Sequence, residues 1–100
     1  MLIEDDVEIR RLAADALASQ GHDVESADHA LAGLEMAVKG SPDLVILDLG
    51  LPDVDGTELL KMIRAVSQVP VMVITARGAD EVVVATLDAG ADDYLIKPFS

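Results

Sequence analysis

Leu44-Val45-Ile46-Leu47-Asp48 is the most informative run of this 100-residue chain. Its four successive apolar residues are typical of a strand that is covered on both faces, as in a parallel sheet. The run ends at Asp48, and residues 49–56 hold two glycines, one proline and two aspartates, a composition that predicts a loop. The sequence therefore places a carboxylate at the point where a buried strand gives way to a loop.

On either side of this run, short apolar segments alternate with segments whose apolar residues recur at helical spacing. Asp6 is expected to cap the first helix and Asp28 the second. The packed side of the second helix would carry Leu31, Leu34 and Val38. We predict strands at 1–3, 24–27, 44–47, 69–74 and 94–96, and helices at 7–20, 28–39, 57–66 and 79–89. This alternation predicts an α/β domain with a doubly wound, five-stranded parallel sheet.

The pattern predicts one helix fewer than is needed for a helix to follow every strand. Five predicted strands are joined by four helices, and the last strand lies close to residue 100. A parallel sheet with part of one face uncovered would expose apolar surface to water. We therefore expect residues 1–100 to form one domain whose fifth helix lies beyond them in the natural protein.

Charge and composition narrow the classes of function. Nineteen acids against seven bases give a formal net charge of −12, which disfavours contact with nucleic-acid phosphates or anionic lipid. Cysteine is absent, which excludes disulfides, thiolate metal sites and cysteine nucleophiles. No apolar run approaches the roughly 18 residues of a membrane span, and no leader precedes the first acids. We expect a cytoplasmic domain that by itself binds neither nucleic acid nor a membrane.

Polar side chains follow the predicted strands at the edge where ligands collect in open parallel sheets. They are Glu4 and Asp5 after the first strand, Asp48 after the third, Thr75 after the fourth and Lys97 after the fifth. Carboxylates about 4 Å apart repel by roughly 4 kcal/mol per pair at a surface-like dielectric, so this cluster favours a cation. Oxygen ligands of this kind suit Mg²⁺ better than zinc. Each residue alone would be a solvated acid, a helix cap or a surface lysine, and only their joint occurrence indicates a site.

These residues lie within four strings that together resemble the receiver domain of two-component response regulators, over essentially the whole chain. The strings are MLIEDD (residues 1–6), LVILDL (44–49) with Leu51-Pro52 and Gly56, VITA (73–76) and GADDYLIKPF (90–99). Each string is weak by itself, whereas the four in this order are specific. The resemblance implies the flavodoxin-like receiver fold.

The resemblance also implies a reaction and the residues that carry it. Asp48 would accept a phosphoryl group from a sensor histidine kinase. The domain would catalyse only this phosphorylation of itself and a slow dephosphorylation. The implied Mg²⁺ ligands are Asp5, Asp48 and the backbone carbonyl of Gly50, with Glu4 acting through water. The implied phosphate-binding and switch residues are Thr75, Ala76, Lys97 and Tyr94, with a cis peptide bond before Pro98.

The last string is most similar to receivers that are joined to winged-helix DNA-binding domains. It implies an output domain beyond residue 100, through which alone the protein would contact DNA and control transcription. It also implies a homodimer through the helix at 79–89 and the strand at 94–96. Not all of Val82-Val83-Val84 can point inward from a helix, so we hypothesise that Val82 and Val83 contribute to an apolar partner surface. The alternative for these valines is a wide core face. The alternative for the function as a whole is a stand-alone or phosphorylation-independent interaction module of the same fold.

Other classes fit less well. A phosphatase of the haloacid dehalogenase type needs a second aspartate where Gly50 stands. An EF-hand loop around Asp53 would need polar ligands where Leu51 and Met62 stand. The two histidines, at positions 22 and 29, are predicted to face solvent at the opposite edge of the sheet.

Overall fold

The structure is a computed structural model that describes residues 1–51, 53–75 and 80–96, apart from the side chains of residues 80–82. Strands and helices alternate along the whole described chain. The strands are β1 Leu2–Ile3, β2 Ser26–Ala27, β3 Val45–Asp48, β4 Val71–Thr75 and β5 Asp93–Ile96. The helices are α1 Val7–Ser19, α2 Ala30–Gly40, α3 Gly56–Val66 and α4 Asp80–Asp88.

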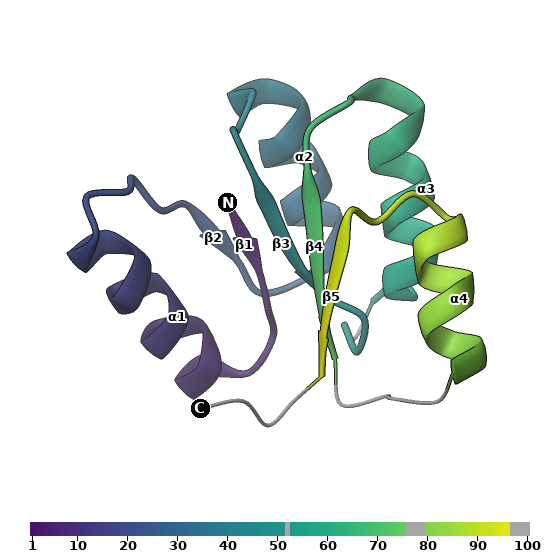
Figure 1. The fold of residues 1–100 in the computed structure, drawn as a ribbon. Coiled ribbons are helices and arrows are strands. Elements are labelled where there is room, and N and C mark those ends of the chain that lie inside the picture. Colours follow the sequence, from purple (N-terminus) through teal and green to yellow (C-terminus); the bar gives the residue numbers. More distant parts are fainter. Residues whose placement is uncertain (52, 76–79, 97–100) are drawn as a thin grey trace.

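The five strands form one parallel sheet in the order β2-β1-β3-β4-β5. Helix α1 lies on one face of the sheet, and α2, α3 and α4 lie on the other (Figure 1). This arrangement confirms the predicted doubly wound fold. The chain builds outward from β1 to β2 and then returns to β3 on the other side of β1, so the strand order reverses between β1 and β3. The carboxyl ends of strands at such a reversal are where ligands bind in open α/β sheets.

The register places the ends of neighbouring strands side by side. Ile3, the last residue of β1, pairs with Leu47, one residue before the end of β3. Asp48 pairs with Ile74, and Thr75 closes β4 opposite the end of β5. The residues that follow β1 and those that end β3 and β4 therefore lie along one edge of the sheet.

The core lies between the sheet and the helices on the α2–α4 face. Helix α3 buries Leu59, Leu60 and Ile63 completely, because these residues share one side of the helix. On the opposite face, α1 contains no buried residue, and its Leu12 side chain is 71% exposed. The side of the sheet that carries α2 and α3 therefore supplies most of the buried apolar packing.

The predicted packing face of α2 was wrong in two of its three residues. Leu31 and Val38 are more than half exposed, whereas Leu34 is partly buried and packs against the core. The buried residues of α2 are Ala30 and Gly33 instead. A Cβ atom at Gly33 would lie 2.6 Å from Ile3 Cδ1, so the helix approaches β1 too closely for a larger side chain. Small residues thus define this face, and hydropathy alone pointed to the wrong side of the helix.

The helix caps follow the predictions at α1 and depart from them at α2. Asp6 caps α1, since its Oδ1 accepts the backbone N–H groups of Glu8 (2.9 Å) and Ile9 (3.2 Å). Asp28, the predicted cap of α2, instead lies 2.7 Å from the His29 ring. The cap of α2 comes from another part of the chain, because Asp53 accepts the N–H groups of its first two residues.

His29 precedes α2 and follows β2, so it lies at the carboxyl edge of the sheet and not at the opposite edge as predicted. The prediction erred because a helix that follows a parallel strand must begin at that strand's carboxyl end. The His29 side chain is 47% exposed, which agrees with the predicted contact with solvent.

Arg64, near the end of α3, joins the amino ends of β4 and β5. Its Nε donates to the Gly90 carbonyl at 2.9 Å, and its Nη1 donates to the Val69 carbonyl. Its Nη2 lies 2.7 Å from Asp92 Oδ2, which also accepts the Val71 N–H at 2.8 Å. The guanidinium therefore joins α3 to the segments that lead into β4 and β5, at the edge of the sheet away from the acids.

We expect Arg64→Ala to lower the free energy of unfolding by about 2 to 3 kcal/mol, because several hydrogen bonds from a charged, mostly buried donor are lost at once. Urea denaturation followed by circular dichroism would measure the change. Lys61→Ala is the control, since Lys61 makes one exposed contact with Glu58 at 3.3 Å and its removal should cost less than about 0.5 kcal/mol. Equal losses in the two variants would contradict the role given to Arg64.

Candidate functional site

Three acidic side chains meet at the strand-order reversal. Glu4 and Asp5 follow β1, and Asp48 ends the neighbouring β3. Each offers a carboxylate oxygen, and these three oxygens lie within 4.8 Å of one another. Glu4 is fully buried and Asp48 is 5% exposed, whereas Asp5 is open to solvent. The structure thus brings together the three acids that the sequence predicted, in a site that is buried on one side and accessible on the other.

Backbone contacts around Asp48 fix where its carboxylate points. Its Oδ1 accepts the Gly50 N–H at 3.1 Å. The Leu49 N–H donates to the Ile74 carbonyl at 3.3 Å, which extends the pairing of β3 with β4 past Asp48. The Gly56 N–H donates back to the Leu49 carbonyl at 3.2 Å. A Cβ at Gly56 would lie 2.4 Å from Leu49 Cα, so only glycine allows α3 to begin this close to the site.

Gly50 borders the Asp48 carboxylate on its exposed side. A Cβ at this position would lie 3.7 and 3.8 Å from the two carboxylate oxygens, in ordinary van der Waals contact. A longer side chain at position 50 would therefore stand beside any group attached to Asp48. Glycine leaves that side of the carboxylate open.

Thr75 and Tyr94 occupy the neighbouring strands. Thr75 ends β4 and is 2% exposed, next to the acids along the same edge. Tyr94 lies in β5, is partly buried and packs against the core. Ala76, Lys97 and Pro98, the other site residues predicted from the sequence, lie outside the described residues, as does the side chain of Val82.

Arg10 is a part of the site that the sequence analysis missed. Its Nη1 donates to the backbone carbonyls of Glu4 at 2.9 Å and Asp5 at 3.4 Å. These bonds brace the turn that carries two of the three acids against α1. A basic residue one helical turn past the Asp6 cap was the available signal, because that spacing returns its side chain toward the start of the helix.

The chemistry of this donor set is that of a hard cation site. All three side chains are carboxylates, and thiolates and imidazoles are absent from the cluster. Three negative charges at this spacing repel one another strongly in a partly buried site, and a divalent cation relieves that repulsion. Within residues 1–51, 53–75 and 80–96, this is the one group of three or more acids, histidines or cysteines close enough to share an ion.

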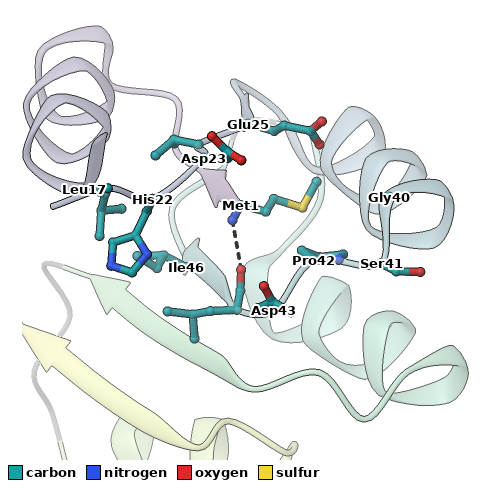
Figure 2. Close-up of a pocket in the computed structure, with 13 residues that line it drawn as sticks. Met1, Leu17, His22, Asp23, Glu25, Gly40, Ser41, Pro42, Asp43 and Ile46 are labelled. Atoms are coloured by element: carbon teal, nitrogen blue, oxygen red, sulfur yellow. Dashed lines mark hydrogen bonds between the residues drawn. The ribbon is translucent and has the colours of Figure 1, made fainter. Parts of the chain in front are cut away.

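A pocket of about 600 Å³ lies at the opposite edge of the sheet, near the amino ends of the strands (Figure 2). The Met1 ammonium group donates to the Leu44 carbonyl there at 2.9 Å. Burial lowers the pKa of this ammonium group, against the opposing effect of the nearby Glu25 and Asp43 carboxylates. None of the acids of the candidate site lines this pocket, so its size does not make it the site of the chemistry.

The comparisons with known proteins agree with this geometry. The family model for the response regulator receiver domain matches residues 1–100. The chain is 48% identical over 99 residues to the KDP operon transcriptional regulatory protein KdpE of Escherichia coli K12, covering 99% of this chain and 44% of that protein. It is 46% identical over 100 residues to the transcriptional regulatory protein CpxR homolog of Haemophilus influenzae, covering 100% and 44%. The chain thus spans less than half the length of these curated relatives.

Solved structures show the same architecture. A CheY-like response regulator receiver domain protein from Methanospirillum hungatei superposes with a TM-score of 0.94 at 32% identity, over 99% of this chain and 80% of that one. The BeF3-activated N-terminal receiver domain of Klebsiella pneumoniae RstA gives a TM-score of 0.94 at 32% identity, over 99% and 85%. These likenesses confirm the predicted receiver fold. In the described part of the chain, every helix is too short or too polar to cross a membrane.

In the presence of EDTA, we expect Asp48→Asn to raise the free energy of unfolding by more than about 1 kcal/mol, because the substitution removes one of three mutually repelling charges. The new amide oxygen can still accept the Gly50 N–H. Urea denaturation would measure the difference. Asp15→Asn, at an exposed position of α1, should change stability by less than about 0.5 kcal/mol. A loss of stability in the Asp48 variant would show that repulsion does not dominate at this site.

Proposed function

This chain belongs to the response regulator receiver domain family, and we propose that it is a switch in which Asp48 carries the phosphoryl group. The observation that carries the proposal is the meeting of the Glu4, Asp5 and Asp48 carboxylates within 4.8 Å at the strand-order reversal. Of the three, Asp48 is the one held by the Gly50 N–H at the end of a buried strand. The backbone therefore helps to orient the Asp48 carboxylate.

The proposed reaction is transfer of a phosphoryl group from a phosphohistidine of a sensor histidine kinase. A carboxylate oxygen of Asp48 forms a bond to phosphorus, the phosphorus–nitrogen bond breaks, and the imidazole nitrogen keeps the electron pair. The product is an acyl phosphate on Asp48. Thr75, nearly fully buried at the end of the next strand, would donate a hydrogen bond from its hydroxyl group to a phosphoryl oxygen. Lys97 is proposed from its sequence position to pair with another such oxygen.

Receiver domains bind Mg²⁺ at an acidic pocket, and the donor set here fits that ion. Asp5, Asp48 and the Gly50 carbonyl would bind it directly, with Glu4 acting through water. When bound, Mg²⁺ supplies positive charge to the oxygens of the phosphoryl group during transfer. The exposure of Asp5 beside two buried acids leaves an open side from which an ion and a phosphodonor can enter.

The process that this domain controls is proposed from the names of its curated relatives. KdpE and the CpxR homolog are named as transcriptional regulatory proteins, and the chain covers 44% of each. We propose that this domain controls transcription through a DNA-binding domain outside residues 1–100. The stand-alone or phosphorylation-independent alternative gains no support from these relatives. The absence of cysteine fits a reducing compartment, so we propose a cytoplasmic location.

We expect the 100-residue chain to gain the mass of one phosphoryl group when it is incubated with Mg²⁺ and acetyl phosphate, and Asp48→Asn to gain none. Intact-mass spectrometry would follow the reaction. Asp15→Asn should react like the unmodified chain, because the exposed carboxylate of Asp15 lies on α1, away from the three-acid cluster. Phosphorylation of the Asp48 variant would show that the acceptor is another residue. If the unmodified chain does not react, the result would favour the phosphorylation-independent interaction module.

The partner surface is proposed on α4 and β5. Val84 is 56% exposed, and Leu87 on the same helix is also exposed. Leu95 and Ile96 in the neighbouring edge strand β5 are exposed as well. These four residues form what we call the α4–β5 surface. Val83, one of the two valines predicted for it, is partly buried, and Val82 stays a prediction from the sequence.

We expect Val84→Glu to weaken self-association of the chain in Mg²⁺ and beryllofluoride by about tenfold, since burying a charge in an apolar interface costs well over the 1.4 kcal/mol that a tenfold change represents. Sedimentation velocity would measure the monomer–dimer equilibrium. Leu12→Glu, at a more exposed apolar position on α1, is the matched control and should leave it unchanged. An unchanged equilibrium in the Val84 variant would rule out this surface.

A further inference from the structure

The amino end of α2 is capped by a residue that lies 23 positions later in the chain. Asp53 Oδ1 accepts the Ala30 N–H at 2.7 Å, and Asp53 Oδ2 accepts the Leu31 N–H at 3.0 Å. Both carboxylate oxygens are thus directed at one helix end, which is the geometry of an N-cap supplied from a distant segment. Asp53 belongs to the β3–α3 loop, residues 49–55, which begins directly after Asp48.

The residues next to α2 in the sequence do not cap it. His29 stands at the N-cap position in an extended conformation and makes no side-chain cap. The Asp28 carboxylate lies 2.7 Å from the His29 ring instead. The side chain that accepts hydrogen bonds from the Ala30 and Leu31 N–H groups is therefore that of Asp53.

The pKa of the Asp53 carboxyl group is lowered. Its partial removal from water acts in the opposite direction, and the hydrogen bonds from Ala30 and Leu31 outweigh that effect. The carboxylate is therefore charged near neutral pH, where its two bonds to the positive end of a helix are strongest.

The loop that Asp53 holds also carries the backbone that orients Asp48. At its start, Leu49 is 1% exposed and bonded to β4, and Leu51 is 8% exposed in the core. At its end, the Gly56 N–H closes back onto the Leu49 carbonyl. Between Leu51 and Gly56, Asp53 ties the outer part of the loop to α2. The Gly50 peptide, whose N–H contacts Asp48 Oδ1, lies inside this fastened segment.

We propose that Asp53 is a positioning residue for the phosphoacceptor site, acting through the β3–α3 loop on the Gly50 peptide. This inference rests on the function proposed above. The Asp53 carboxylate that caps α2 would also hold the backbone of the β3–α3 loop in the orientation that binds a metal ion. Asp53 itself contacts α2 and takes no part in the reaction.

The test compares Mg²⁺ dependence in four forms of the 100-residue chain: unmodified, Asp53→Ala, Asp53→Asn and Ile63→Val. The initial rate of phosphorylation by acetyl phosphate is measured by intact mass over a range of Mg²⁺ concentrations, with the thermal midpoint of each form recorded alongside. Ile63 is fully buried in α3 and belongs to the core cluster, so its variant should lose stability through a change that lies outside the β3–α3 loop and leaves the Asp53 cap intact.

We expect Asp53→Ala to raise the Mg²⁺ concentration at half-maximal rate about tenfold, the size typical of losing a group that orients a metal ligand. The rate at saturating Mg²⁺ should change less than about twofold, because Asp48 and the phosphodonor are unaltered. Asp53→Asn retains one acceptor oxygen, so its half-maximal Mg²⁺ concentration should lie between those of the unmodified chain and Asp53→Ala. Ile63→Val should keep the unmodified half-maximal concentration despite its lower thermal midpoint.

An unchanged half-maximal Mg²⁺ concentration in Asp53→Ala, or an equal shift in Ile63→Val, would overturn the positioning role and leave Asp53 as a stabilising cap alone. Failure of the unmodified chain to react at all would instead count against the proposed function. The milder Asp53→Asn variant keeps the comparison decisive if the alanine variant unfolds.

Discussion

The close approach of three carboxylates at the end of β1 and β3 is the constraint to which the rest of this structure is fitted. Such a cluster costs free energy, because like charges repel and two of the three acids are removed from water. The fold holds the three acids together through the hydrogen-bonded pairing of the strands that carry them. Glu4 and Asp5 leave a paired strand, Asp48 ends its neighbour, and parallel register brings the two strand ends to the same edge. A cluster of mutually repelling carboxylates is well suited to bind a cation, which relieves the repulsion.

Close approaches at two glycines pack helices tightly around this part of the sheet. Gly33 lets α2 lie directly against Ile3 of β1, and Gly56 lets α3 begin against Leu49, one residue past Asp48. Arg10 braces the turn after β1, and the Gly50 N–H orients the Asp48 carboxylate. Helices α1, α2 and α3 thus all pack close to the ends of β1 and β3. A change of charge at Asp48 would act on closely packed neighbours, and a switch between two arrangements requires such coupling.

The sequence was informative about the site and less so about the helices around it. The acids and the threonine were found because strands with continuous apolar runs are easy to recognise, and because their carboxyl ends must share an edge. The packing face of α2 was missed because Gly33, which carries no hydropathy signal, makes the closest approach to the sheet. The cap by Asp53 was missed because helix caps are sought next to the helix, whereas this one arrives from another loop. Arg10 was missed because it donates to backbone carbonyls, and its position one helical turn past the Asp6 cap, which was the available signal, was not used.

From the residue pattern alone follow the class of fold, the order of its elements and the identity of the three acids and the threonine that meet at one edge. Those properties follow from local periodicity and from the rule that parallel strands end together. Tertiary structure alone decided how closely the acids approach, which face of α2 is buried and which aspartate caps it. Each of these depends on distances between segments far apart in the chain, and such distances are set by how side-chain volumes fill the space between the sheet and its helices.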